Sequence, residues 1–132
     1  MAETKSPGSN RILIADDNVV IRQMISAVVK QEGFSVVTVS DGQEAYNILK
    51  DDADFRAAIF DMMMPRLGGI DVIRYMRGDD RLKKIPAMMI TAEKDYQLMA
   101  QSFNAGATVF LPKPFTPAQL QITFRMLLAG KV

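Results

Sequence analysis

The sequence contains neither cysteine nor histidine among its 132 residues. The absence of cysteine excludes disulfide bonds and thiolate metal sites. The absence of histidine removes the commonest general base, and it means that this chain cannot itself carry a phosphohistidine. Any metal ion that the chain holds must therefore be bound by oxygen atoms, which favours a hard cation such as Mg²⁺.

Long apolar runs and an excess of charge of one sign are also missing. No run approaches the roughly 20 apolar residues of a membrane span, and the N-terminus lacks the apolar stretch of a secretory signal. Lys and Arg total 16 against 15 Asp and Glu, which gives a net charge of +1 and no general attraction to nucleic acid or an anionic membrane. We therefore expect a cytoplasmic protein that binds neither of them directly.

The length suits a single domain with one core. Residues 1–10 are mostly small and polar, so we expect a flexible N-terminal tail there and one domain over residues 11–132. Within that domain, short apolar runs alternate with longer segments of helical period. The expected strands are 12–15, 34–39, 57–60, 86–91 and 108–111.

Each expected strand is followed by an expected helix. The expected helices are 18–31, one from a cap at Ser40 or Asp41 to Lys50, one from Gly68 or Gly69 to Arg77, 95–104, and one from the cap Thr116 to about Ala129. Five strand–helix units imply an α/β protein with a doubly wound parallel sheet and helices on both of its faces.

Polar residues stand where four of these strands end. Asp16 and Asp17 follow the first strand, Asp61 follows the third, Thr91 ends the fourth, and Lys113 comes shortly after the fifth. Ligands of an open α/β sheet bind outside the carboxyl ends of its strands, so we expect these residues to converge. Three carboxylates at one place repel one another, and a divalent cation together with the lysine relieves that repulsion.

A carboxylate between a metal ion and an ammonium group can attack phosphorus. The metal ion and Lys113 would neutralise the charge on the transferred phosphoryl oxygens, and the hydroxyl group of Thr91 would donate a hydrogen bond to them. We therefore interpret Asp61 as a nucleophile whose apolar surroundings exclude most water.

Four motifs in this order resemble a known family. They are the Asp pair in LIADDN, the Asp and Pro in FDMMMPRLGG, the Thr in MMITAE and the Lys-Pro in VFLPKPF. Together they resemble the receiver domain of two-component response regulators, close to the stand-alone chemotaxis type, over about residues 10–129. The resemblance implies a flavodoxin-like fold with a five-stranded parallel sheet in the strand order 2-1-3-4-5.

The resemblance also implies a division of roles at the site. Asp61 would accept a phosphoryl group from a phosphohistidine of a partner histidine kinase or phosphotransfer protein. Mg²⁺ would be held by Asp17, Asp61 and the backbone carbonyl of Met63, with Asp16 acting mainly through a metal-bound water. Lys113 would pair with the phosphoryl group. Such a protein catalyses its own phosphotransfer and dephosphorylation but is not a conventional enzyme.

A switch is implied as well. Thr91 would move toward the phosphoryl group, the ring of Phe110 would turn inward, and the face formed by the fourth helix, fifth strand and fifth helix would change shape to bind a downstream protein. Phe110 lacks the hydroxyl group of the tyrosine that often stands there. Met63 and Glu93 flank the site at positions that tune dephosphorylation, and the Lys113-Pro114 bond would be cis.

Plainer explanations exist for each motif alone. Asp16-Asp17 could cap a helix, Phe110 could be a core ring, and Lys113-Pro114 could be a surface turn. The chain ends soon after its last helix, which favours a single-domain regulator over a receiver fragment of a larger protein such as a transcription factor. A phosphatase with an aspartate nucleophile would need a second acid where Met63 stands, and a pseudo-receiver that only binds partners would not need the acidic set.

Overall fold

Five parallel strands form one sheet in the order β2-β1-β3-β4-β5, as the resemblance implied. The computed structural model describes residues 10–91 and 96–130. The strands are β1 (Arg11–Ala15), β2 (Ser35–Val39), β3 (Ala57–Asp61), β4 (Ala87–Thr91) and β5 (Val109–Pro112). β2 and β5 are therefore the edge strands, and β3 lies at the centre.

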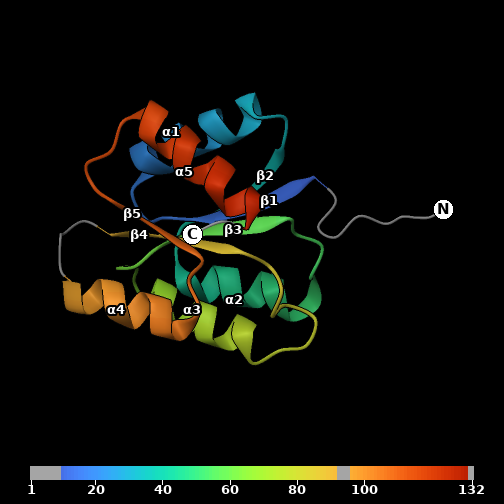
Figure 1. Cartoon of the computed structure of the whole chain (residues 1–132). Helices are drawn as coiled ribbons and strands as arrows, with labels where there is room; N and C mark the ends of the chain where they lie inside the picture. Colours follow the sequence, from blue (N-terminus) through green and yellow to red (C-terminus); the bar gives the residue numbers. More distant parts are fainter. Residues whose placement is uncertain (1–9, 92–95, 131–132) are drawn as a thin grey trace.

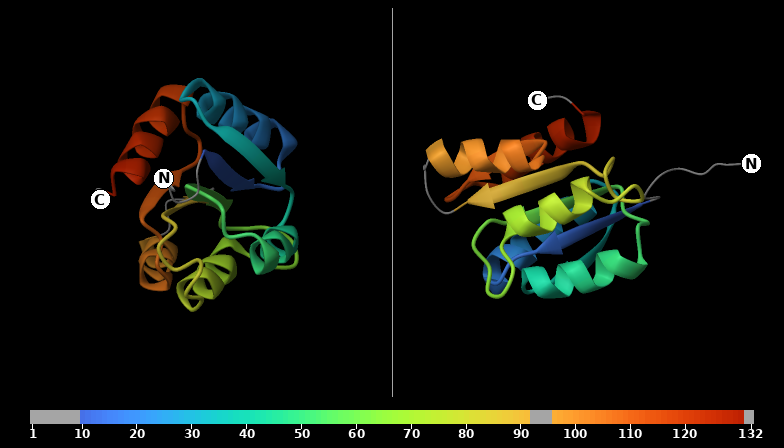
Figure 2. Two further views of the ribbon diagram at one scale, coloured as in Figure 1. Left: turned by 90° about the vertical axis from the view of Figure 1, so that its right-hand side faces the viewer. Right: turned by 90° about the horizontal axis from the view of Figure 1, so that it is seen from below.

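Five helices cover the sheet on both faces, which confirms the predicted doubly wound α/β architecture. They are α1 (Val19–Gln31), α2 (Gly42–Asp51), α3 (Gly69–Arg77), α4 (Tyr96–Ala105) and α5 (Pro117–Ala129). Figures 1 and 2 show α1 and α5 on one face and α2, α3 and α4 on the other. Within the described ranges, no helix combines the length and apolar character needed to cross a bilayer.

Alternate residues of each inner strand supply the two cores. In β1, Ile12 and Ile14 pack with α1 and α5, whereas Leu13 and Ala15 pack with α2 and α3. All residues of β3 and β4 are buried, because parallel strands inside a doubly wound sheet are covered on both faces. This burial explains why these segments are continuous apolar runs in the sequence.

Local signals fix where the helices begin. Asn18 caps α1, since its side chain accepts hydrogen bonds from two backbone N–H groups of the first turn. Asp41 rather than Ser40 caps α2, and the backbone N–H of Ser40 donates instead to Glu44. Thr116 forms the expected cap of α5, completed by Gln119 in a capping box.

Some element boundaries differ from the sequence predictions by one residue. β3 extends to Asp61, because this residue still pairs with Ile90 of β4. Phe34 lies outside β2, since its N–H donates to the carbonyl of Val29 at the end of α1. β5 begins one residue later than predicted, because the Thr108 hydroxyl group accepts a hydrogen bond from a backbone N–H at the start of β4. The predicted tail falls outside the described residues apart from residue 10.

Candidate functional site

The carboxyl ends of β1 and β3 bring three carboxylates together. Each of Asp16, Asp17 and Asp61 offers an oxygen atom, and these atoms all lie within 4.8 Å of one another. β1 and β3 are neighbours whose last paired residues are Ala15 and Phe60, so the residues that follow are forced to meet. Asp16 is fully buried, Asp61 is 4% exposed, and Asp17 is open to solvent. The predicted convergence of these three residues is confirmed.

The ammonium group of Lys113 faces two of these carboxylates. Its Nζ lies 3.5 Å from Oδ2 of Asp61 and 3.6 Å from Oδ2 of Asp16. The backbone N–H of Lys113 donates to the carbonyl of Thr91 at 2.6 Å, which fixes the chain after β5 against the end of β4. The Lys113-Pro114 bond is cis, as the resemblance implied.

Backbone donors orient the other carboxylate oxygens. The N–H of Asn18 donates to Oδ1 of Asp16 at 2.8 Å, and the N–H of Met63 donates to Oδ1 of Asp61 at 3.3 Å. Oδ2 of Asp16 is buried and has no hydrogen-bond partner within the described part of the chain. The ammonium group of Lys113, 3.6 Å away, lies beyond hydrogen-bond distance of this atom, so Oδ2 of Asp16 is free to bind a cation, which carboxylate oxygens prefer.

The electrostatics of the cluster point the same way. Burial, followed by the neighbouring charge of Asp16, raises the pKa of Asp61 to about 6, although Lys113 acts in the opposite direction. Burial likewise raises the pKa of Asp16 above its usual range. A divalent cation would offset the repulsion between these groups. Since only oxygen donors are present, the residues fit a hard ion such as Mg²⁺.

Thr91 and Phe110 lie on the same face of the sheet. Phe110 pairs with Met89 in the β4–β5 register, and Thr91 stands two residues after Met89, so all three side chains lie on the sheet face that α2, α3 and α4 cover. Thr91 is buried beside the acidic cluster, whereas Phe110 is half-buried with its ring centroid 6.2 Å from that of Phe103. The two proposed switch residues are therefore diagonal neighbours on adjacent strands.

Met63 follows Asp61 in the loop between β3 and α3, and its side chain points largely to solvent. Its backbone N–H already contacts Asp61, so its carbonyl lies in the same turn of chain. Glu93 lies outside the described residues. The sequence did not indicate Arg66 as part of the site. From this loop Arg66 forms an ion pair with Asp41, the cap of α2, and holds the pKa of that carboxyl group below its usual range.

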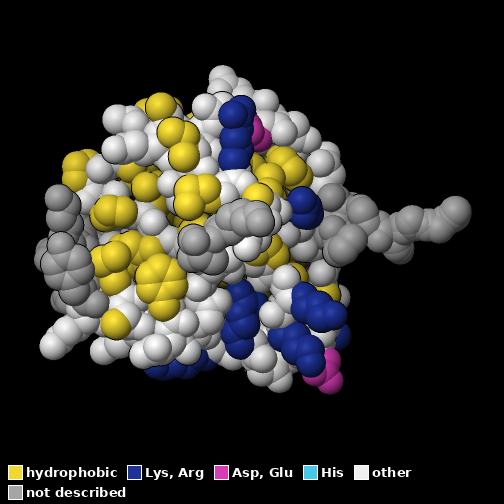
Figure 3. Space-filling model, viewed as in Figure 1, with side chains coloured by type: hydrophobic (Ala, Val, Ile, Leu, Met, Phe, Trp, Pro, Cys, Tyr) yellow, Lys and Arg dark blue, Asp and Glu magenta, His cyan; other side chains and the backbone are white. Residues whose placement is uncertain are grey.

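Exposed apolar side chains gather between α4 and α5, over β5 (Figure 3). Phe103, Ile122 and Met126 are the large apolar residues exposed there. A hollow of about 280 Å³ lies among them, lined by Met99, Phe103, Val109, Phe110, Pro112, Thr123 and Met126. α4 contains no charged residue, and the only one in α5 is Arg125, which forms an ion pair with Glu32. This face is therefore apolar and nearly uncharged.

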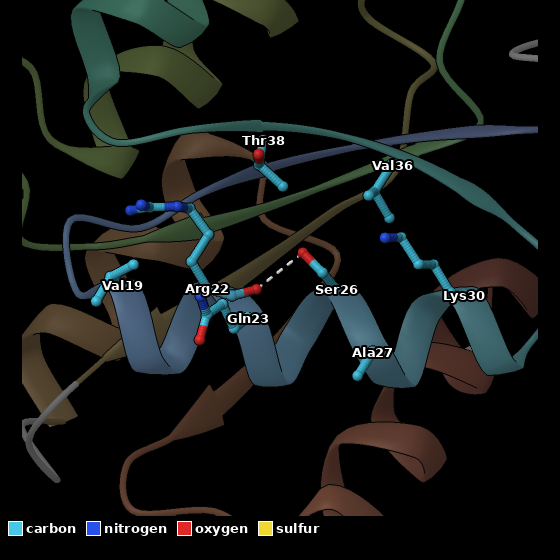
Figure 4. A pocket seen from close by; sticks show the side chains of 8 residues that line it. All are labelled: Val19, Arg22, Gln23, Ser26, Ala27, Lys30, Val36 and Thr38. Carbon is cyan, nitrogen blue, oxygen red and sulfur yellow. Dashed lines mark hydrogen bonds between the residues drawn. The ribbon is translucent and has the colours of Figure 1, made fainter.

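A different hollow, of about 490 Å³, lies along α1 beside the edge strand β2. Side chains of the two elements face each other across it, and the hydroxyl group of Ser26 donates to the carbonyl of Arg22 (Figure 4). Arg22 also donates a hydrogen bond of 2.6 Å to the carbonyl of Asp16. Arg22 therefore links this hollow to the turn that carries Asp16, but the three clustered carboxylates do not line it.

An acidic cluster with a facing lysine, at the carboxyl edge of a five-stranded doubly wound sheet, is the arrangement of a receiver domain. Residues 12–125 match the family model of the response regulator receiver domain, and the chain belongs to this family. Domains of this family generally bind Mg²⁺ and interact with histidine kinases and downstream targets.

The relatives that resemble this chain include both longer proteins and proteins of similar length. The chain is 36% identical over 120 residues to the response regulator MprA of Mycolicibacterium vanbaalenii, covering 89% of this chain but only 50% of MprA. It is 33% identical over 112 residues to the chemotaxis protein CheY1 of Helicobacter pylori, covering 84% of this chain and 90% of CheY1. The chain thus spans about half of one relative and nearly all of the other.

The fold has close counterparts among solved structures. The chemotaxis response regulator CheY4 of Vibrio cholerae superposes with a TM-score of 0.83 at 32% identity, over 89% of this chain and 98% of that one. The family, the strand order and the arrangement of layers agree with what the motifs implied.

Proposed function

We propose that this chain is a Mg²⁺-dependent phosphoacceptor of a two-component pathway, in which Asp61 receives a phosphoryl group from the phosphohistidine of a partner histidine kinase or phosphotransfer protein. The observation that carries the proposal is the position of Asp61. It is 4% exposed, it lies within 4.8 Å of two other carboxylates, and the ammonium group of Lys113 is 3.5 Å away. The lack of histidine in the chain agrees with a donor on another protein.

Each residue of the cluster has a separate task in this proposal. Asp16, Asp17, Asp61 and the carbonyl of Met63 hold Mg²⁺, with Asp16 acting mainly through water. When bound, the ion supplies positive charge that offsets the charge of the transferred phosphoryl oxygens. Lys113 supplies a second positive charge from the β5 side of the site.

The transfer itself is a substitution at phosphorus. An oxygen of ionised Asp61 forms a bond to phosphorus while the P–N bond to the donor imidazole breaks, and the electron pair of that bond stays with the nitrogen. With a pKa of about 6, Asp61 is mostly ionised at neutral pH, as this attack requires. The buried surroundings keep bulk water away from the acyl phosphate.

The output of the proposed switch is the α4–β5–α5 face. Thr91 approaches the phosphoryl group, and Phe110, its diagonal neighbour, then turns toward the space that Thr91 leaves. Because Phe110 also lies near Phe103 of α4, its movement reshapes the apolar hollow there. A downstream protein would bind this face mainly through apolar contacts, since the face carries so little charge.

The lifetime of the phosphoryl group is proposed to depend on Met63 and Glu93, whose side chains would control how water reaches Asp61. Met63 is 67% exposed, so its side chain stands at the solvent side of the site. The measurement is the rate of phosphoryl loss. A Glu93→Ala variant with an unchanged rate would exclude Glu93 from this role.

Two settings of this domain remain open to test. The match to nearly the whole of CheY1 favours a regulator that acts alone, whereas the match to half of MprA favours a receiver within a longer regulator. The two settings share the phosphoacceptor chemistry and differ in the downstream partner.

Intact-mass spectrometry after incubation with acetyl phosphate and Mg²⁺ tests the proposal. We expect one phosphoryl adduct on the wild type, and none on Asp61→Asn or in the presence of EDTA. An adduct that persists in Asp61→Asn would place the phosphoryl group elsewhere. No adduct on a wild type that also fails to bind Mg²⁺ would favour the pseudo-receiver, which acts only through its unphosphorylated surface.

A further inference from the structure

The loop that follows Asp61 is attached to the start of helix α2. Residues 62–68 connect β3 to α3 and pass over the N-terminus of α2. There the guanidinium group of Arg66 forms an ion pair with Oδ2 of Asp41, the residue that caps α2. Asp41 is buried, and Oδ1 of the same carboxylate accepts a hydrogen bond of 2.8 Å from the N–H of Glu44. The ion pair thus joins a loop of the site to a fixed point in the fold.

The backbone of Arg66 shows that this part of the loop has a tightly turned conformation. Its φ of 71° lies in the left-handed region, and Arg66 is the one residue other than glycine with a positive φ in the described part of the chain. L-amino acids rarely adopt this conformation, because the Cβ atom crowds the backbone. The N–H of Leu67 donates to the carbonyl of Pro65 at 2.8 Å, which closes a tight turn around Arg66, and the ion pair with Asp41 holds the side chain that this turn presents.

A second contact between the loop and α2 involves the residues that follow Arg66 and Asp41. A Cβ atom added to Gly42, the first residue of α2, would lie 2.0 Å from the carbonyl oxygen of Leu67. The backbone of the loop therefore sits directly against the start of α2, and only glycine fits between them. The loop is therefore attached to α2 by two adjacent contacts. One is the ion pair between Arg66 and Asp41, and the other is the close packing of Leu67 against Gly42.

This attachment matters because Met63 has little else to hold it. The side chain of Met63 is 67% exposed, and its N–H donates to Oδ1 of Asp61 at 3.3 Å. At the near end of the loop, the N–H of Gly69 donates to the carbonyl of Met62 at 3.1 Å. Met63 lies between two fixed points of the loop, which are the Gly69–Met62 hydrogen bond and the attachment at Arg66. These two points therefore set the position of the Met63 carbonyl.

We infer that Asp41 and Arg66 are a positioning pair, which presets the loop so that the Met63 carbonyl can complete the Mg²⁺ site. The inference rests on the proposed function, since it assigns these residues a role in that same site. Without the pair, the loop must be ordered when the ion binds, and the affinity for Mg²⁺ falls. We expect the Mg²⁺ affinity to fall about threefold to tenfold. This is more than loss of a solvent-exposed ion pair causes, and less than loss of a residue that orients a metal ligand causes.

The direction of the effect separates positioning from simple electrostatics. Deleting a cation near an acidic site should tighten Mg²⁺ binding through charge alone, whereas loss of positioning weakens it. Arg66→Ala is therefore the informative variant. Alanine carries the same backbone penalty as arginine at this φ, so the change isolates the side chain.

The test is a Mg²⁺ titration of the whole chain followed by backbone amide NMR shifts, since the chain has no tryptophan to report binding. Arg66→Ala and Asp41→Asn should each weaken binding, and asparagine keeps the helix cap while losing the charge. The double variant should bind no more weakly than either single variant, because one pair has been broken. Arg66→Lys keeps the charge and should stay within about twofold of the wild type.

Arg125→Ala is the matched control, since Arg125 is 64% exposed and Arg66 is 62% exposed, and each pairs with a mostly buried carboxylate. It should leave Mg²⁺ affinity unchanged. Unchanged or tighter Mg²⁺ binding in a folded Arg66→Ala variant would overturn the inference, whatever Asp41→Asn does, because loss of the Asp41 charge can weaken binding without any effect on the loop. A wild type that does not bind Mg²⁺ would instead overturn the proposed function. Thermal unfolding without Mg²⁺ identifies any variant that does not fold. Such a variant is set aside, and the Mg²⁺ affinities of the folded variants test the inference.

Discussion

The Nζ atom of Lys113 lies 3.5 Å from Oδ2 of Asp61, although 52 positions of sequence separate the two residues. The same ammonium group lies 3.6 Å from Oδ2 of Asp16. One cation therefore faces two buried carboxylates, and it offsets only part of their charge. The remaining repulsion favours a bound cation at the site, and a negatively charged phosphoryl group depends on the positive charge of that cation and of Lys113.

Replacing Lys113 by methionine should lower the free energy of unfolding by about 1–3 kcal/mol in the presence of a chelator, because two buried carboxylates lose the cation that they face. Urea unfolding measures the difference. Lys83→Met is the control, since Lys83 pairs with Asp80 on the exposed surface and its loss should change stability by less than about 0.5 kcal/mol. Equal stability of Lys113→Met and the wild type would mean that the ammonium group does not relieve the repulsion.

Replacing Asp61 by asparagine should stabilise the protein when Mg²⁺ is absent. The pKa of Asp61 is about 6 in the folded protein against an ordinary value of 3.8, so the folded state binds this proton more tightly than the unfolded chain does. Ionisation of Asp61 therefore costs the folded state about 2–3 kcal/mol above pH 6, and the cost disappears as both states become protonated below about pH 4.

The stability gain of Asp61→Asn should accordingly be largest near neutral pH and shrink as the pH falls. Urea unfolding of both proteins in EDTA, at a series of pH values between about 4 and 7, measures the gain. Asp80→Asn changes an exposed carboxylate and should give no comparable gain. A gain that did not vary with pH would show that packing, rather than the charge of Asp61, causes it.

Two glycines with positive φ should differ in their tolerance of alanine. Gly33 has a φ of 95° and open space around its Cα, so Gly33→Ala should cost only the backbone penalty of about 1–2 kcal/mol. Gly106 has a φ of 115°, and an added Cβ atom would lie 2.5 Å from Cγ of Arg77. Arg77 cannot move freely, because its guanidinium group donates to the carbonyls of Gly106 and Ile85.

Gly106→Ala should therefore cost about 1–3 kcal/mol more than Gly33→Ala. Urea unfolding of the two variants in parallel gives the comparison, and the shared backbone penalty cancels in the difference. Equal losses would mean that Arg77 moves aside without losing its hydrogen bonds.

Much of the fold and the acidic cluster could be predicted because both follow from short-range signals. Alternating apolar runs and helical periods indicated the layers, and the rule that ligands bind at the carboxyl ends of parallel strands brought Asp16, Asp61 and Lys113 together. The strand order came from the motifs, which resemble a family, because periodicity alone does not say which strands are neighbours.

The attachment at Arg66 could not be predicted in the same way. The sequence indicates Asp41 only as one of two candidate helix caps, with Ser40, and no local pattern says that a capping carboxylate also pairs with a residue 25 positions away. Arginine is also an unexpected residue for a left-handed backbone position, so its sequence neighbours give no warning. Contacts of this kind depend on how a loop crosses a helix, which only the folded chain determines.

Replacing Thr91 by valine should separate phosphoryl acceptance from the proposed switch. Valine keeps the buried shape and removes the hydroxyl group, while Asp61 and the residues around it are unchanged, so acetyl phosphate should still phosphorylate the variant. The aromatic NMR resonances of Phe110 and Phe103 should then shift much less on phosphorylation than in the wild type, because the hydroxyl group that is proposed to approach the phosphoryl group is missing. Thr38→Val, on the exposed edge strand β2, should retain the full shifts. Full shifts in Thr91→Val would mean that the ring of Phe110 responds to Asp61 by another route.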